Sequence, residues 1–195
     1  LAHRHCQGKA GGGGICRTTG RRGFLKPMGA IRETVRKTSI FKNLEEEEIS
    51  EVLNIATEKR VHQKDLIMQE GDEGSTMYML LEGEVEVSKA LTMKFGGEDI
   101  RKAEKVLSTL KAQDHVILGE MALIAKEKRS ASVLAKTDCV LLELRRDDFM
   151  RLIETRTPLG VKVLLSLAEL MAARLRHSDE NVIRLTTALS IALSR

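Results

Sequence analysis

The segment from Leu118 to Val133 contains the residue types best suited to bind an anion together with a hydroxyl group. Gly119 lets the backbone approach a ligand closely, and Glu120 places a carboxylate in an apolar run. Residues 121–125 can form one helical turn, whose unpaired N–H groups point at an anion. Arg129 follows at the start of an alternating strand, where its guanidinium can make a bidentate contact with a phosphate.

Glu120 and Arg129 stand nine positions apart, on either side of that helical turn. A carboxylate and a guanidinium in this arrangement can recognise a molecule that has both hydroxyls and a phosphate, as sugar phosphates do. The alternative is that the two side chains pair with each other as a structural salt bridge. The residue types alone leave both interpretations open.

Other residues that could do chemistry lack a suitable pattern. After residue 27 the histidines are His62, His115 and His177, which are far apart and form no His-x-His pair, so an iron or zinc active site is not expected. No serine or cysteine stands in a nucleophile motif. Cys139 lies in an apolar strand pattern, where we expect a small buried hydrophobe. We expect neither enzymatic activity nor a bound metal.

Basic charge is concentrated in residues 1–27, which hold six basic residues, no acidic one and seven of the 15 glycines. The remainder has 26 basic and 28 acidic residues, a net charge of −2, which argues against a nucleic-acid surface in the folded part. We expect 1–27 to be a disordered, non-native leader, with the native chain starting at Met28. Its His3, His5, Cys6 and Cys16 fit no structural zinc pattern.

The residues after Met28 must form the scaffold that positions the 118–133 segment. Ile31, Val35 and Ile40 predict a short helix, and the acids from Glu45 predict the start of a second one, because carboxylates suit the positive end of the helix dipole. Short alternating segments from residue 60 to 144 predict an all-β sandwich or barrel. We expect strands at 59–63, 65–69, 76–82, 84–90, 105–111, 130–135 and 139–144, with a surface excursion over 91–101.

Helical periodicity returns after residue 145. Asp147 and Asp148 suit the first turn of a short helix that continues through Ile153, and Pro158 suits the first turn of a long final helix. That final helix has two lines at seven-residue spacing, 168–175–182–189 and 171–178–185–192, which are apolar except at Ser178. The pattern predicts a coiled-coil homodimer; the alternative is that the stripe packs on the chain's own β domain.

Two motifs resemble the hallmarks of cyclic nucleotide-binding domains, and they occur in that family's order. Gly119-Glu-Met-Ala-Leu followed by Arg129-Ser-Ala-Ser-Val resembles the phosphate-binding cassette of the family. Gly71-Asp72, followed by residues 75–87, resembles the hairpin motif that faces the cassette. With the flanking helices, the resemblance covers about residues 41–185.

The resemblance implies a mainly β, α+β fold, in which an eight-stranded antiparallel jelly-roll barrel has helices before and after it. The domain is expected over 28–157, and the long dimerisation helix over 158–195. The final helix is similar to that of catabolite-activator-type regulators. The sequence stops at Arg195, where the DNA-binding helix-turn-helix of those regulators would follow, so no nucleic-acid partner is expected for this chain.

The resemblance also implies which residues bind the ligand, cAMP or cGMP. Arg129 and Ser130 would contact the cyclic phosphate, and Glu120 the ribose 2′-OH. Asp179 departs from the regulators, which have a neutral hydroxyl at that position. Gly119, Met121 and Ala122 would offer backbone groups. The eight residues assigned to the ligand are thus Gly119, Glu120, Met121, Ala122, Arg129, Ser130 and, on the final helix, Arg174 and Ser178.

The expected function is that of a cyclic nucleotide sensor or regulatory module in signal transduction, with cAMP favoured over cGMP, acting as a homodimer through an unidentified effector protein. No apolar run approaches 18 residues, so no membrane partner is expected. The absence of an export signal and of a sensible disulfide pairing indicates the cytoplasm. The alternatives are a truncated catabolite-activator-type transcription regulator that has lost its output domain, and a docking module that no longer binds nucleotide.

Overall fold

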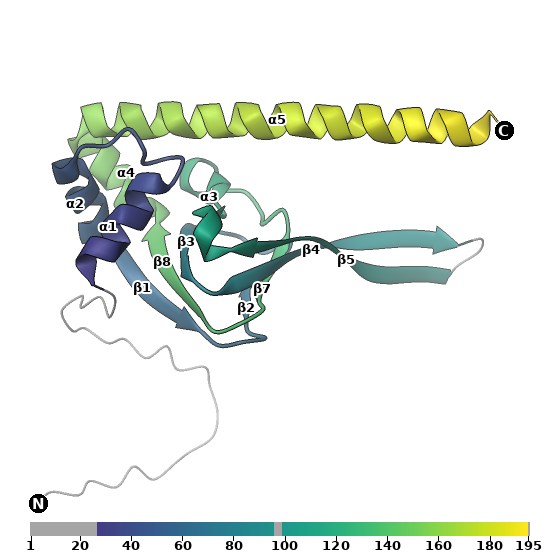
Figure 1. The fold of residues 1–195 in the computed structure, drawn as a ribbon, viewed down its shortest axis with the longest axis horizontal. Coiled ribbons are helices and arrows are strands. Elements are labelled where there is room, and N and C mark those ends of the chain that lie inside the picture. The colour runs from purple at the N-terminus through teal and green to yellow at the C-terminus, as the bar shows by residue number, and fades with distance from the viewer. Residues whose placement is uncertain (1–26, 96–98, 195) are drawn as a thin grey trace, which may run out of the picture.

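The computed structural model describes residues 27–95 and 99–194, so the expected leader, apart from Pro27, lies outside the described residues. Helices α1 (Met28–Lys37) and α2 (Glu46–Ile55) precede the strands, and α4 (Arg146–Thr155) and α5 (Thr157–Leu193) follow them (Figure 1). The short α3 (Met121–Ile124) and the 3-10 turn η1 (Ala112–Asp114) lie between strands. The helices predicted from the sequence are thus present.

The strands form two antiparallel four-stranded sheets. The first has the order β1 (Ala56–Val61), β8 (Cys139–Arg145), β3 (Thr76–Glu82), β6 (Ile117–Leu118), and the second has the order β2 (Leu66–Met68), β7 (Ser132–Ala135), β4 (Glu84–Phe95), β5 (Asp99–Lys111). No strand pairing within 27–95 and 99–194 joins the two sheets, so a closed barrel is not confirmed. The fold combines helices with antiparallel sheets and ends in a long helix, as expected.

The surface excursion expected over 91–101 is wrong. Strands β4 and β5 pair from Glu84 and Lys111 out to Phe95 and Asp99, with one bulge between Val87 and Ser88. The far part of the hairpin extends beyond the other strands of the second sheet (Figure 1). The backbone pairing of these two strands continues well beyond the pairing of β4 with β7, which ends at Ser88.

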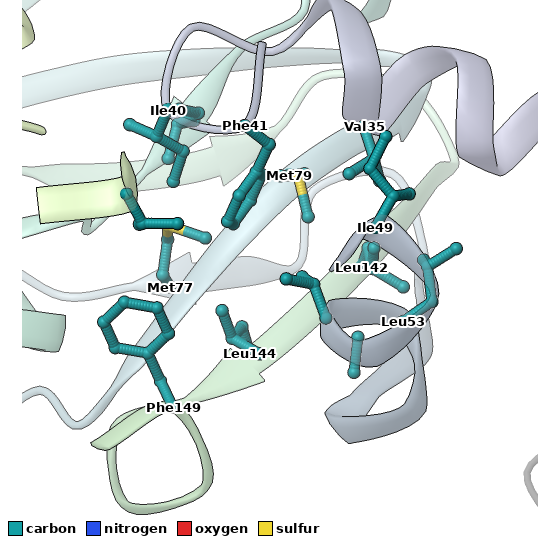
Figure 2. Packing of buried hydrophobic residues seen from close by; sticks show 14 of the residues in the cluster. Val35, Ile40, Phe41, Ile49, Leu53, Met77, Met79, Leu142, Leu144 and Phe149 are labelled. Atoms are coloured by element: carbon teal, nitrogen blue, oxygen red, sulfur yellow. The ribbon is translucent and has the colours of Figure 1, made fainter. Parts of the chain in front are cut away.

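The apolar run in β3 reflects a strand buried on both faces. Met77, Met79 and Leu81 point to a core beneath the helices, whereas Tyr78 and Leu80 point to a second core between the sheets. Figure 2 shows the first core, where residues of β3 and β8 meet side chains from the helices and from the loop before α2. The helices, the first sheet and the second sheet therefore form three layers. Strand β3 belongs to the middle layer and contributes side chains to the cores on both of its faces.

The fully buried residues of helix α5 lie in its first third. They lie between Leu159 and Leu167, and ion pairs join Lys162 to Glu48 and Glu169 to Lys42. Every residue from Ala172 to Ser194 is exposed. Beyond Met171 the two predicted heptad lines are not buried against the chain's own domain, so the alternative that the stripe packs there does not hold for that part of the helix. No helix-turn-helix is evidenced in the described part of the chain.

Candidate functional site

A cavity of about 200 Å³ lies where the 118–133 segment meets the second sheet and α5. Its lining brings together seven of the eight predicted ligand residues: Gly119, Glu120, Met121, Ala122, Arg129, Ser130 and Arg174. Ser178, the eighth, does not line it and is exposed one turn further along α5. Asp179 is exposed as well. The predicted cluster therefore exists as one site, with α5 contributing a single side chain to it.

Glu120 is a buried carboxylate at the start of α3. Gly119 makes the turn from β6 into α3 with a φ of +72°, a conformation that favours glycine. This turn delivers the Glu120 side chain into the cavity, where it is 5% exposed and pairs with the half-exposed guanidinium of Arg174. The pair with Arg174 accounts for the burial of the charge, and no ion pair between Glu120 and Arg129 occurs among the described residues. That alternative interpretation is wrong.

Arg129 lies across the cavity floor against the start of β3. Its Nη2 donates to the carbonyl oxygen of Thr76 at 2.8 Å and to the Thr76 hydroxyl at 2.9 Å. Its Nη1 is buried and has no hydrogen-bond partner within the described chain. Burial lowers the pKa of Arg129, while Tyr78 and Glu120 act in the opposite direction, and a guanidinium stays protonated at neutral pH. The site therefore holds a fixed cation with unused donor capacity.

Two glycines create the space that this guanidinium occupies. A Cβ atom at Gly74 would lie 2.4 Å from Arg129 Nε, and one at Gly119 would lie 2.1 Å from Arg129 Nη1. Both separations are far below a van der Waals contact. The Gly-rich turn before β3 and the glycine before Glu120 are thus required by the same side chain.

The remaining lining residues were not identified from the sequence. Met68, Val87, Leu110 and Val133 form an apolar wall from the second sheet, next to the Ser108 hydroxyl. Val87 and Ser108 are register partners on β4 and β5, which places them on one face of the hairpin. Strand alternation identifies inward positions, but only the packing of one sheet on the other decides which of them border a cavity.

The charges around the cavity favour an anion. Three basic side chains, Lys128, Arg129 and Arg174, and two acidic ones, Glu120 and Glu127, line it, which leaves one net positive charge. Glu120 and Arg174 compensate each other, so Arg129 and Lys128 dominate the side of the cavity formed by residues 127–131. An anion of one charge beside an apolar wall is the ligand type that this lining suits.

The described residues contain no group of three or more His, Cys, Asp or Glu side chains placed to hold a metal ion. They also contain no helix that is long and apolar enough to span a membrane.

Known proteins share this architecture and its motifs. The model of the cyclic nucleotide-binding domain matches residues 58–156, just over half of the chain. The chain is 31% identical to the cAMP-dependent protein kinase regulatory subunit of Schizosaccharomyces pombe over 127 residues, 63% of this chain and 30% of that protein. It is 30% identical to human cGMP-dependent protein kinase 2 over 125 residues, 64% of this chain and 15% of the kinase.

A solved structure extends the likeness to about three quarters of the chain. The catabolite activator protein of Thermus thermophilus is 32% identical, with a TM-score of 0.63 over 76% of this chain and 63% of that one. In each of these comparisons the chain spans less than two thirds of the relative's length. The region matched by the family model, residues 58–156, contains both motifs, nearly all of the two sheets and the residues of the cavity except Arg174. The chain belongs to the cyclic nucleotide-binding domain family.

Proposed function

We propose that the chain is a regulatory module that binds a cyclic nucleotide, cAMP in preference to cGMP, in the cavity lined by Glu120 and Arg129. One observation carries the proposal: the side chain of Arg129, whose Nη1 has no hydrogen-bond partner within the described chain, lines the same cavity as a buried carboxylate. A cyclic phosphate carries one negative charge and accepts hydrogen bonds, which matches the free donor. The ribose 2′-OH is a donor, which matches the Glu120 carboxylate.

Each part of the ligand has a counterpart in the lining. The phosphate lies against Arg129 and the adjacent Ser130 hydroxyl, with the backbone of Gly119, Met121 and Ala122 around it. The purine lies against the apolar wall of the second sheet, where burial of its faces contributes to affinity. The preference for cAMP rests on the likeness to a cAMP-dependent regulatory subunit and to a catabolite activator protein, and the cGMP-dependent kinase relative makes the comparison of the two nucleotides an essential test.

Occupancy of this site is transmitted to α5 through Glu120. In the structure the carboxylate is paired with Arg174. A ribose hydroxyl that donates to the Glu120 carboxylate shares this acceptor with Arg174, so ligand binding changes the interaction between Glu120 and α5. The proposed output is therefore a change at the exposed part of α5, read by an effector protein.

The affinity of the site for cyclic nucleotides is the direct test. Calorimetry with cAMP, cGMP and linear AMP should show binding of the cyclic compounds, and binding should raise the melting temperature. Arg129→Leu removes a charge-assisted hydrogen bond worth about 1.5–3 kcal/mol, so affinity should fall about ten- to a hundredfold. Arg60→Leu, at an exposed position on β1, is the matched control and should bind like the parent. Absence of binding by the parent protein would leave the docking-module alternative.

The exposed face of α5 supports the proposed homodimer. Leu175, Val182 and Leu189 lie on one heptad line and are 64%, 56% and 59% exposed. Burying such a line against a second copy would remove apolar surface from water. Val182→Glu should give a monomer in sedimentation equilibrium, and Thr187→Glu, on the outward position of the same heptad, should leave the association unchanged. A monomeric parent protein would refute the dimer and leave the nucleotide site unaffected.

The division of the chain follows the same proposal. Residues 28–157 would bind the ligand, and 158–195 would form the dimerisation helix; α5 begins at Thr157, next to that boundary. The proposed compartment is the cytoplasm, consistent with Cys139 being a buried free thiol. A truncated transcription regulator remains the alternative for the whole protein, and its nucleotide site would be the same.

A further inference from the structure

Thr76, the first residue of β3, contacts Arg129 through two different oxygens, and Arg129 is the residue proposed to bind the phosphate. Its carbonyl oxygen accepts from Arg129 Nη2 at 2.8 Å, and its hydroxyl accepts from the same nitrogen at 2.9 Å. The hydroxyl in turn donates to the hydroxyl of Tyr78 at 3.2 Å. A threonine hydroxyl has one proton to donate, so the bond to Tyr78 leaves a lone pair directed at the guanidinium.

Tyr78 is a firm anchor for this chain of hydrogen bonds. It is 6% exposed and belongs to the core between the two sheets, with Lys59 Nζ 5.2 Å from the centre of its ring. Thr76 and Tyr78 are two residues apart on one strand, so their side chains lie on the same face of β3. The relay from Tyr78 through Thr76 to Arg129 therefore starts in rigid core and ends in the cavity.

Contacts with Thr76, Gly74 and Gly119 restrict the orientation of the guanidinium. Gly74 and Gly119 approach Arg129 so closely that neither position has room for a Cβ atom. Thr76 occupies Nη2, which leaves Nη1 as the nitrogen without a partner in the described chain. The contacts made by the rest of the side chain thus determine that Nη1, and not Nη2, is the nitrogen left without a partner.

We propose that Thr76 is a positioning residue, whose hydroxyl holds Arg129 so that a phosphate meets an already oriented donor. This inference rests on the proposed function and assigns the hydroxyl a role beyond folding. An arginine has many rotamers, and ordering it on binding weakens association. Without the Thr76 hydroxyl, part of the free energy of ligand binding is used to order Arg129, so affinity for cAMP should drop about two- to tenfold.

Calorimetry of cAMP binding by three single variants tests the role. Thr76→Val keeps the shape and the carbonyl oxygen but removes the hydroxyl, and should bind two- to tenfold more weakly. Thr76→Ser restores the hydroxyl and should bind like the parent protein, a rescue that a purely structural role of the methyl group would not give. Tyr78→Phe removes the acceptor that orients the hydroxyl, and should cause a smaller loss. Melting temperatures of the free proteins show whether each variant is folded.

A double variant separates positioning from a general change in the cavity. In an Arg129→Leu background there is no guanidinium to position, so adding Thr76→Val should leave the remaining cAMP affinity unchanged. The same loss in both backgrounds would overturn the role of Thr76, as would full affinity in Thr76→Val alone. If the parent protein bound neither cAMP nor cGMP, the proposed function would fail and this role with it; binding by the parent with no effect at Thr76 overturns only the role.

Discussion

Replacement of Arg174 by methionine tests whether α5 is held at the site by the charge of Glu120. Methionine keeps the length and the apolar stem of the side chain but leaves the carboxylate without its cation. Removing one member of a fully buried ion pair costs about 3–5 kcal/mol, whereas an exposed pair contributes about 0–1 kcal/mol. Glu120 is 5% exposed and Arg174 is 51% exposed, so this pair lies between these limits. We expect a loss of about 2 kcal/mol in the free energy of unfolding.

Urea unfolding followed by far-ultraviolet circular dichroism measures this loss at one fixed protein concentration, because the proposed self-association would add to the apparent stability. The melting temperature should fall by about 4–8 °C for a chain of this size. Arg176→Met is the matched control, since Arg176 is exposed on the same helix and has no ion pair among the described residues; it should change stability by less than about 0.5 kcal/mol.

The decisive comparison is a double-mutant cycle with Glu120→Gln. Once the carboxylate is neutral, Arg174→Met should cost no more than the Arg176 control, because no buried charge is left unpaired. An equal cost in both backgrounds would show that Arg174 stabilises the protein by packing, and would refute the link between Glu120 and α5 on which the proposed output depends.

Three further predictions concern other parts of the molecule. Burial acts to raise the pKa of Glu48, but bonds from Lys162 and the Glu45 N–H lower it overall, so its stabilising effect is present above about pH 4.3 and is lost on further acidification. The stability gap between the parent and Glu48→Gln should therefore close between pH 6 and 3 in urea titrations. Burial raises the pKa of the Cys139 thiol, so peptide mapping after alkylation should find it modified only in denaturant. Gly119→Ala should lower the free energy of unfolding by about 1–3 kcal/mol, because of its positive φ and the clash with Arg129, whereas Gly29→Ala in α1, with open space around it, should raise it by about 0.5–1 kcal/mol.

Local patterns predicted most of the fold. Strand β3 has the bounds predicted from its apolar run, and Pro158 lies in the first turn of α5 as expected. The two-residue β6 was missed because it is too short to show alternation. The far half of the β4–β5 hairpin was missed because it is stabilised by pairing between its own strands.

The site was predicted where its members are close in the sequence or belong to a motif. Glu120 and Arg129 flank one turn, and both line the cavity. The partner of Glu120 is 54 residues away, on another element, and no local spacing reveals such a contact. Thr76 was part of a motif, but its bond to Arg129 spans 53 residues and depends on how the two sheets pack. Ser178 was assigned from the resemblance of the final helix to that of the regulators, and such a resemblance does not fix the distance from the helix to the cavity.

The length of α5 makes it a lever. The helix is held on the domain along its first third, where Leu159 and Val163 are buried and Lys162 is bound to Glu48. Arg174 is 17 residues from Thr157, about 26 Å along the axis, and Leu193 is 36 residues away, about 54 Å. A sideways displacement of 1 Å at the nucleotide cavity would thus become about 2 Å at the tip if the helix pivots as a rigid rod about its first turn. If the proposed ligand displaces the helix at the cavity, the spacing of surfaces far from that cavity changes with it.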